Sequence, residues 1–169
     1  MEHDACGVGV IASTEGKKSR EIVEYGIEAL KAVWHRGAVD ADGKTGDGAG
    51  IHVEIPKDFF IEKIEVTGHD YDNSEICVGM IFLPRNDYSS QESCKTIVES
   101  ELTKNDFSIY GWRQVPVNPK ILGEKAFQTM PEIIQVLFKS NDPNLIDKNL
   151  ERKIYETRKR IENKAFNAS

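Results

Sequence analysis

The run of apolar residues at 76–83 limits the fold more than any other stretch of this chain. Its sequence is Ile-Cys-Val-Gly-Met-Ile-Phe-Leu, and Pro84 follows it directly. A short, continuous apolar run that is bounded in this way is typical of a buried strand. We therefore predict a central β-strand over 76–83 that ends at Pro84.

Weaker patterns along the chain predict further strands and helices. Apolar residues at helical spacing favour an amphipathic helix over 19–35, capped by Ser19. Ser89 and Glu92 have the spacing of a capping box and open a helix that ends near Lys104. Further strands are predicted over 8–12 (short and largely buried), 51–55 (half-buried), 107–117 and 132–138, and further helices over 58–66, 121–128 and 145–169. Helices and strands follow one another in mixed order, so we expect an α+β fold.

Composition narrows the classes of function. The chain has 169 residues, enough to bury a core of its own. Its formal net charge of −6 argues against the basic face that non-specific nucleic-acid binding needs. No apolar run has membrane-spanning length, and the acidic amino terminus lacks the apolar segment of a signal peptide. We expect neither a nucleic-acid nor a membrane partner.

The three cysteines, Cys6, Cys77 and Cys94, are far apart and show no Cys-x-x-Cys spacing. This pattern indicates reduced thiols in a reducing compartment and neither a disulfide framework nor a zinc site. The four histidines are equally scattered and offer no metal-ligand spacing. We predict no metal site and no cofactor site in these residues.

A glycine-rich segment (residues 37–50) follows the first predicted helix. It contains five glycines together with Asp40, Asp42 and Asp47, a composition that requires a loop. It does not match a phosphate-binding loop, because five residues separate its first glycine from its Gly-Lys pair where that motif has four. Its aspartates also lack calcium-loop spacing. We interpret the segment as backbone that wraps tightly around a site.

Cys6 stands almost at the amino terminus and precedes a Gly-Val-Gly sequence. If residues 1–5 are removed, Cys6 carries both a thiol and a free α-amine, and the amine can act as the base that activates the thiol. Gly7 would allow close approach to the sulfur. The alternative is a buried, inert cysteine. Arg36, at the joint of the first helix and the glycine-rich segment, is open to a structural role or to a role in anchoring the nucleophile.

Longer motifs occur in a fixed order along the chain. They are Glu2-His-Asp-Ala-Cys6-Gly-Val-Gly, His35-Arg-Gly-Ala38, Thr45-Gly-Asp-Gly-Ala-Gly-Ile51, Val78-Gly-Met-Ile-Phe-Leu-Pro84, Gly111-Trp-Arg-Gln-Val-Pro-Val117, Pro131-Glu-Ile-Ile-Gln135 and Arg158-Lys-Arg-Ile-Glu162. Together they resemble the amino-terminal part of the class II glutamine amidotransferase domain of the glutamate synthase large subunit. The resemblance covers essentially the whole chain and divides it into a leader-like segment, 1–5, and an incomplete amidotransferase domain, 6–169.

The resemblance implies the fold of the amino-terminal-nucleophile hydrolases, a four-layer αββα architecture that this chain represents only in part. It implies that Cys6 attacks the side-chain amide of L-glutamine and releases ammonia, leaving a glutamyl thioester that water hydrolyses to glutamate. The resemblance also implies that five residues lie near the nucleophile and help to hold it in place: Gly7, Arg36, Gly37, Asp47 and Gly48.

In the complete enzyme the ammonia would pass to a second site, where 2-oxoglutarate is aminated with FMN and an iron–sulfur cluster. Those cofactors would belong to the remainder of the large subunit, which is the expected partner together with a small reductase subunit. The electron donor (ferredoxin, NADH or NADPH) is left open. The expected location is the cytoplasm, or the plastid stroma in a photosynthetic eukaryote.

Two motifs of the family do not occur in the 169 residues. One is His-Asn-Gly-Glu, whose Asn-Gly pair forms the oxyanion hole; the other is Arg-(Phe/Tyr)-Ser-Thr-Asn, whose arginine binds the α-carboxylate of glutamine. One oxyanion-hole donor is worth about 10²–10³ in rate, so we expect the segment to be inactive alone and active within the complete subunit. The alternatives are a non-catalytic remnant that serves as an interaction module, and a redox-sensing thiol protein.

Overall fold

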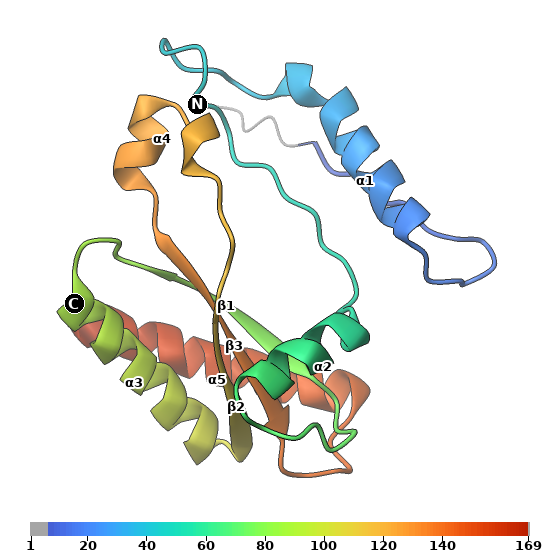
Figure 1. Cartoon of the computed structure of the whole chain (residues 1–169), viewed down its shortest axis with the longest axis vertical. Helices are drawn as coiled ribbons and strands as arrows, with labels where there is room; N and C mark the ends of the chain where they lie inside the picture. Colours follow the sequence, from blue (N-terminus) through green and yellow to red (C-terminus); the bar gives the residue numbers. More distant parts are fainter. Residues whose placement is uncertain (1–6, 169) are drawn as a thin grey trace. The chain divides into compact units, whose positions relative to one another are not determined.

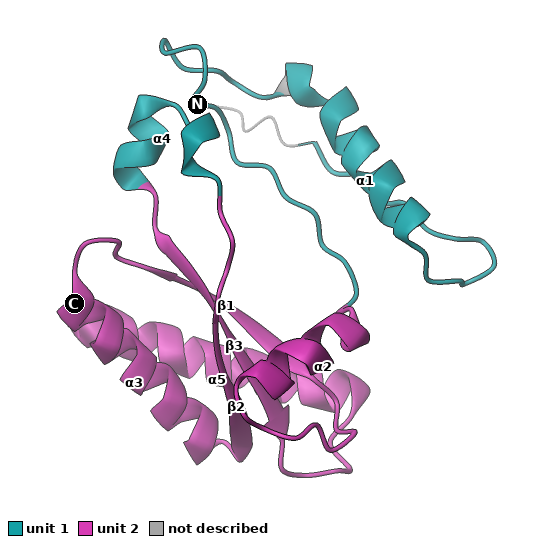
Figure 2. Ribbon diagram, in the orientation of Figure 1, with its two compact units in different colours: residues 1–54, 118–129 teal, residues 55–117, 130–169 magenta. Residues whose placement is uncertain are grey.

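The structure is a computed structural model that describes residues 7–168. The chain forms two compact units (Figure 2). Unit 1 consists of residues 1–54 and 118–129, and unit 2 of residues 55–117 and 130–169. Each unit is therefore assembled from two segments that are distant in sequence.

Unit 2 is built on an antiparallel sheet of three strands, β1 (Cys77–Leu83), β2 (Phe107–Gln114) and β3 (Glu132–Ser140) (Figure 1). The strand order is β1-β3-β2, so the last strand in the sequence lies in the middle and pairs with both others. The predictions of strands at these three places are confirmed. The prediction that the 76–83 run is central is wrong for the described sheet, because β1 lies at its edge.

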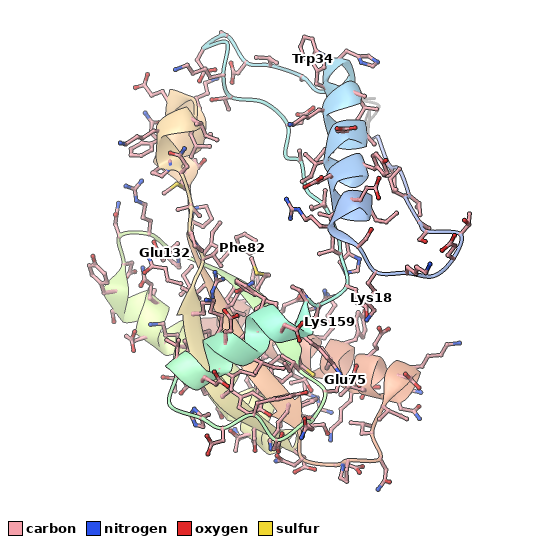
Figure 3. The ribbon with its side chains drawn as sticks, turned by 45° about the vertical axis from the view of Figure 1, so that its right-hand side comes forward. Lys18, Trp34, Glu75, Phe82, Glu132 and Lys159 are labelled. Carbon is pink, nitrogen blue, oxygen red and sulfur yellow. The ribbon has the colours of Figure 1, made fainter. Side chains whose placement is uncertain are left out.

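The apolar continuity of β1 has a different cause from a central place in the sheet. Cys77 and Leu83 are buried, whereas Met80 is 47% and Phe82 63% exposed (Figure 3 labels Phe82). Apolar side chains favour a strand whether or not both of its faces are covered, so a continuous apolar run does not show how many strands flank it. β3 carries a glutamate at its first position and a lysine near its end, yet it takes the middle place.

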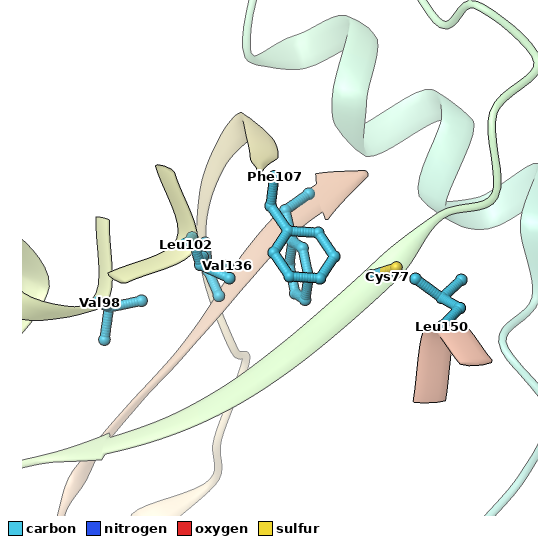
Figure 4. Close-up of a cluster of buried hydrophobic side chains, with 7 residues drawn as sticks. Cys77, Val98, Leu102, Phe107, Val136 and Leu150 are labelled. Carbon is cyan, nitrogen blue, oxygen red and sulfur yellow. The ribbon is translucent and has the colours of Figure 1, made fainter. Parts of the chain in front are cut away.

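The helices α3 (Tyr88–Lys104) and α5 (Asp147–Ala168) cover one face of this sheet (Figure 1). Side chains from both helices and all three strands form a buried cluster there (Figure 4), made of Cys77, Val98, Leu102, Phe107, Val136, Phe138 and Leu150. The rings of Phe107 and Phe138 meet edge to face with their centroids 5.3 Å apart, a favourable geometry for an aromatic pair. This cluster is the main core of unit 2.

The first turn of α3 differs from the sequence prediction. Asp87 is the N-cap: its Oδ1 accepts a hydrogen bond from the Ser90 N–H at 3.0 Å, and its Oδ2 accepts one from the Ser90 hydroxyl at 2.6 Å. The predicted capping box of Ser89 and Glu92 is wrong, and Glu92 instead pairs with Lys95 at 2.9 Å. Aspartate caps a helix as well as serine does, and Asp87 reaches the first turn earlier in the chain.

The helix α2 (Lys57–Val66) covers part of the opposite face and confirms the predicted helix over 58–66. Successive residues of a strand point to opposite faces, so Leu137 of β3 points away from the core formed with α3 and α5. It joins a second buried cluster with Phe60, Ile64, Ile76 and Tyr110. Leu137 and Ile64 are both 0% exposed.

Unit 1 contains α1 (Arg20–Ala32), the short 3₁₀ helices η1 (Trp34–Arg36) and η2 (Pro119–Ile121), and α4 (Glu124–Thr129). The predicted helix start at Ser19 is confirmed, because the Ser19 Oγ accepts a hydrogen bond from the third residue of α1. None of the helices formed by the described residues has the length and apolar character needed to cross a membrane.

Two strands predicted in unit 1 are not formed by the described residues. Residues 8–12 and 51–55 have no regular secondary structure, and Val8 is 92%, Val10 87% and Ile51 47% exposed. A strand forms only where a neighbouring backbone satisfies its N–H and C=O groups. Within residues 7–168 neither segment pairs with another strand, so the predicted burial is wrong as well. The α+β class is confirmed by the helices and the antiparallel sheet.

Candidate active site

The residues predicted for the site all belong to unit 1. Cys6 lies outside the described residues, and Gly7, the first described residue, is exposed. Arg36 ends η1, and its side chain lies outside what the structure describes. The described part of the candidate site is therefore Gly7 together with the glycine-rich segment.

The glycine-rich segment begins as a small hairpin rather than as an open loop. Val39 and Gly46 form an antiparallel bridge, and the Asp40 N–H donates a hydrogen bond to the Thr45 carbonyl oxygen at 2.7 Å. A Cβ at Gly46 would lie 3.0 Å from the Ala38 carbonyl oxygen. Glycine at this position therefore allows the two arms of the hairpin to approach closely.

Asp47 closes the open end of the hairpin with both its backbone and its side chain. Its N–H donates to the Ala38 carbonyl oxygen at 3.3 Å, and its Oδ2 accepts from the Ala38 N–H at 2.8 Å. A Cβ at Gly37 would lie 3.4 Å from the Trp34 carbonyl oxygen and 4.0 Å from the Asp47 carboxylate. The structure thus brings Gly37 and Asp47 together, and Asp47 fixes the backbone immediately after Arg36.

Gly48 has no such packing reason to be glycine. A Cβ built on Gly48 or on Gly50 would meet no heavy atom of the described chain within 4 Å. Gly48 therefore supplies space beside Asp47 and makes no contact through a side chain. Gly48 and Gly50 belong to the last residues of the glycine-rich segment, which follow the hairpin.

Asp42 holds the turn of the hairpin. Its Oδ1 accepts hydrogen bonds from the N–H groups of Lys44 at 2.9 Å and of Thr45 at 2.7 Å, and its Oδ2 accepts from the Thr45 hydroxyl at 2.5 Å. The Thr45 hydroxyl, followed by these N–H groups, lowers the pKa of Asp42 to about 2. The carboxylate is thus engaged by its own turn, a use that explains the aspartate without a bound cation.

One of the two described cysteines is poorly placed to act as a nucleophile. Cys77 is buried in the core of unit 2, and this burial, with a smaller effect of the Glu75 charge, raises its pKa to about 12. Cys94 is half-buried on α3. Since a thiol attacks as its thiolate, Cys77 is unreactive at neutral pH. Cys6 stays the candidate nucleophile.

An open hollow of about 430 Å³ in unit 2 lies between the start of α3 and the ends of β2 and β3 that adjoin it. Trp112 and Arg113 are among the residues that line it. The Trp112 Nε1–H donates to Glu99 of α3 at 2.7 Å, and the Arg113 Nη1 donates to Gln135 of β3 at 2.6 Å. Both side chains of the Gly-Trp-Arg motif therefore have a structural role: they hold β2 against α3 and β3.

Sequence reasoning missed one part of this region, the contact of the glycine-rich hairpin with the segment around Gly123. Gly123 lies against Asp42 and Thr45, and the Lys125 Nζ pairs with the Asp40 carboxylate at 2.6 Å. No local sequence pattern predicts such a contact, because it joins residues that are far apart in sequence. Gly123 also lies inside the helix predicted over 121–128, whereas in the structure it stands between η2 and α4.

The family described as Glutamine amidotransferases class-II matches residues 6–169. The chain therefore belongs to the class II glutamine amidotransferases. Its α+β structure, with helices on a small antiparallel sheet, is consistent with part of the four-layer fold that the sequence motifs implied.

Glutamate synthases are among the chain's relatives. The chain is 55% identical over 161 residues to the glutamate synthase (NADPH) large chain of Azospirillum brasilense, a match that covers 95% of this chain and 11% of the relative. It is 40% identical over 162 residues to the chloroplastic ferredoxin-dependent glutamate synthase 2 of Arabidopsis thaliana, covering 95% and 10%. For the chloroplastic ferredoxin-dependent glutamate synthase of Spinacia oleracea the identity is 37% over 165 residues, covering 97% and 10%. The chain thus spans about a tenth of the length of these relatives.

Proposed function

We propose that this chain carries the nucleophile of a glutaminase site and that Cys6 is the nucleophile. The observation that supports this most directly is the family match, which begins at Cys6. Burial makes Cys77 inert, which removes one of the two other cysteines from consideration. The same match supports treating residues 1–5 as a leader that precedes the amidotransferase domain.

The proposed reaction needs a deprotonated thiol. Once residues 1–5 are removed, the α-amine of Cys6, with a reference pKa of roughly 7.7–8.0, takes the proton of the thiol. The sulfur then attacks the side-chain amide carbon of L-glutamine, and the amine returns the proton to the nitrogen as the carbon–nitrogen bond breaks. Ammonia leaves, a glutamyl thioester remains, and water hydrolyses it to glutamate and the free thiol.

The hairpin supports this chemistry through its backbone. The two hydrogen bonds between Asp47 and Ala38 hold the chain directly after Arg36 and Gly37. We infer that this arrangement holds the backbone that carries Arg36, the residue that the family resemblance places beside the nucleophile. Accurate placement of such groups is worth large factors in rate.

Within a longer enzyme the ammonia would serve the amination of 2-oxoglutarate, with FMN and an iron–sulfur cluster. The described residues contain no group of three or more His, Cys, Asp or Glu side chains that could hold a metal ion. The remainder of a glutamate synthase chain and a small reductase subunit are the proposed partners. The proposed location is the cytoplasm, or the plastid stroma in a photosynthetic eukaryote.

The test compares Cys6→Ala with the matched control Cys94→Ala, each in the longest natural chain that contains these residues. We expect Cys6→Ala to lower glutamine hydrolysis at least about 10³-fold, since a lost nucleophile typically costs more than that. Cys94→Ala should retain the wild-type rate. Intact-mass measurement of the wild-type chain should show that it begins at Cys6.

Other outcomes would point to the other readings of Cys6. Hydrolysis that survives Cys6→Ala would overturn the assignment of the nucleophile. A wild-type chain that keeps Met1 and hydrolyses no glutamine would favour an interaction module. Oxidation of Cys6 by peroxide, without reaction towards glutamine analogues, would favour a redox sensor. The 169 residues expressed alone should show no turnover, because the oxyanion-hole and glutamine-binding motifs are missing from them.

A further inference from the structure

Gly123 occupies an unusual position in unit 1. It is the one buried residue among those residues of the unit whose burial the structure describes. It stands between η2 and α4, in the segment that returns to unit 1 after β2 has been completed in unit 2. A buried glycine among half-buried and exposed residues indicates close approach of two backbones.

The neighbour of Gly123 is the turn of the glycine-rich hairpin. A Cβ at Gly123 would collide with the Thr45 hydroxyl and the Asp42 carboxylate and would lie 2.6 Å from the Thr45 backbone nitrogen. Because one of these atoms belongs to the backbone, the collision cannot be relieved by side-chain rotation alone. Every residue other than glycine would therefore push the hairpin away.

Two polar contacts reinforce this approach. The Glu124 N–H donates a hydrogen bond to the Asp42 carboxylate, which also holds the turn of the hairpin. The Lys125 ammonium pairs with the Asp40 carboxylate at 2.6 Å. The Gly123 latch, as we name the contact of residues 123–125 with Asp40, Asp42 and Thr45, thus joins two segments that are distant in sequence.

The hairpin transmits the position of its turn to the candidate site. Its two arms are joined by the Val39–Gly46 bridge and by the hydrogen bonds between Asp47 and Ala38. Arg36 and Gly37 directly precede the first arm. A displacement at the turn therefore moves the backbone that carries the site residues.

We propose that the Gly123 latch positions the glycine-rich hairpin for glutamine hydrolysis, which makes Gly123 and Asp42 positioning residues of that reaction. This inference rests on the proposed function. The latch contains no group expected to contact glutamine, since the family's glutamine-binding motif lies outside these residues. Loss of the latch should therefore lower kcat and leave KM for glutamine nearly unchanged.

The test introduces Gly123→Ala into the longest natural chain that contains these residues, with Gly26→Ala as the matched control. A Cβ at Gly26 of α1 would meet no heavy atom within 4 Å. Misplacement of a site by about 1 Å can cost about 10²-fold in rate. For Gly123→Ala we expect a glutamine-dependent kcat about 10–100-fold below wild type and a KM within about threefold, whereas Gly26→Ala should match wild type in both.

A second readout separates positioning from general damage. In the same preparations an ammonium salt replaces glutamine as the nitrogen source for glutamate formation from 2-oxoglutarate. Gly123→Ala should retain the ammonium-dependent rate, because that reaction bypasses the glutaminase site. An equal loss of both rates would show a general structural defect and would overturn the positioning role.

The remaining outcomes separate the latch from the function on which it rests. Equal kcat for Gly123→Ala and Gly26→Ala, with Cys6→Ala inactive, would refute the latch and leave the proposed function intact. Full hydrolysis by Cys6→Ala would refute the proposed function itself. If Gly123→Ala does not accumulate, Asp42→Asn replaces it. This variant keeps the size of the side chain but turns one of the two accepting oxygens into an NH₂ group, so that one of the hydrogen bonds to Asp42 loses its acceptor. Its kcat should fall about tenfold under the same criteria.

Discussion

Replacement of Gly111 by alanine tests why the Gly-Trp-Arg motif begins with glycine. Gly111 follows a register irregularity in the pairing of β2 with β3. Its φ is +150°, a value that residues with a side chain rarely adopt. A Cβ there would lie 2.7 Å from Thr67 Cγ2 and 2.9 Å from Thr67 Cβ, at the end of α2.

The expected cost has two parts of similar size. Backbone strain at a positive φ costs about 1–3 kcal/mol, and the overlap with Thr67 costs about 1–3 kcal/mol. The stiffer unfolded chain of the alanine variant offsets about 0.4–1 kcal/mol of this. The free energy of unfolding of unit 2 should therefore fall by about 3 kcal/mol, a large fraction of the about 5–15 kcal/mol of an ordinary domain.

Two further variants separate the two parts. Gly68→Ala carries only the backbone strain, because Gly68 has φ +84° and no heavy atom within 4 Å of its Cβ position; it should cost about 1–2 kcal/mol. Thr67→Ser removes Cγ2 and keeps the hydroxyl that lies 2.8 Å from the Tyr110 carbonyl oxygen. In the Gly111→Ala background Thr67→Ser should restore about 1 kcal/mol, whereas alone it should cost about 0.5–1 kcal/mol.

Urea unfolding followed by tryptophan fluorescence measures these differences. Trp112 is half-buried in unit 2. Trp34, labelled in Figure 3, is 74% exposed and changes its surroundings little on unfolding. With a denaturant slope of about 2 kcal/mol per molar urea, Gly111→Ala should lower the midpoint by about 1.5 M. The reasoning is refuted if Gly111→Ala costs no more than Gly68→Ala, or if Thr67→Ser is equally destabilising in both backgrounds.

Two further predictions concern the core of unit 2. Leu137→Ala should lower the free energy of unfolding by about 3–4 kcal/mol, because Leu137 is 0% exposed, whereas Met80→Ala, at a side chain 47% exposed, should cost less than about 1 kcal/mol; equal thermal midpoints for the two variants would contradict the described core. Burial raises the pKa of Cys77 to about 12, so the unfolded chain, with a thiol pKa of about 8.5, releases this proton first. The stability due to the protonated thiol is therefore complete below about pH 8.5 and declines as the pH rises towards about 12; Cys77→Val should flatten that decline in urea midpoints taken at successive pH values.

The elements of unit 2 could be predicted from the sequence because their signals are local. The apolar run of β1 and the helical spacing in α3 each follow from which side chains must be buried. The order of the strands could not be predicted in the same way, because pairing depends on which strand edges meet. The run at 76–83 is the most apolar strand and still lies at an edge of the described sheet.

The candidate site was predictable only where a motif marks it. Gly37 and Asp47 were selected from the sequence, and the structure joins them through Ala38. The contact of Gly123 with the hairpin lies beyond such reasoning, because its two sides have no shared local pattern. The strands predicted at 8–12 and 51–55 failed for a related reason: apolar residues favour a strand, and the partner that completes it must come from another segment.

The place of β3 in the sheet determines when the sheet can form during synthesis of the chain. In the described sheet β1 and β2 pair only with β3, the last strand to leave the ribosome. The end of β1 precedes the start of β3 by about 50 residues, which at about 5–20 residues per second is a delay of several seconds. During that delay the most apolar strand of the nascent chain has two open edges, a state that chaperones recognise and that favours aggregation. Ribosome pausing after β1 has emerged and before β3 emerges would prolong this exposure, whereas pausing once β3 has left the exit tunnel would leave the sheet already closed.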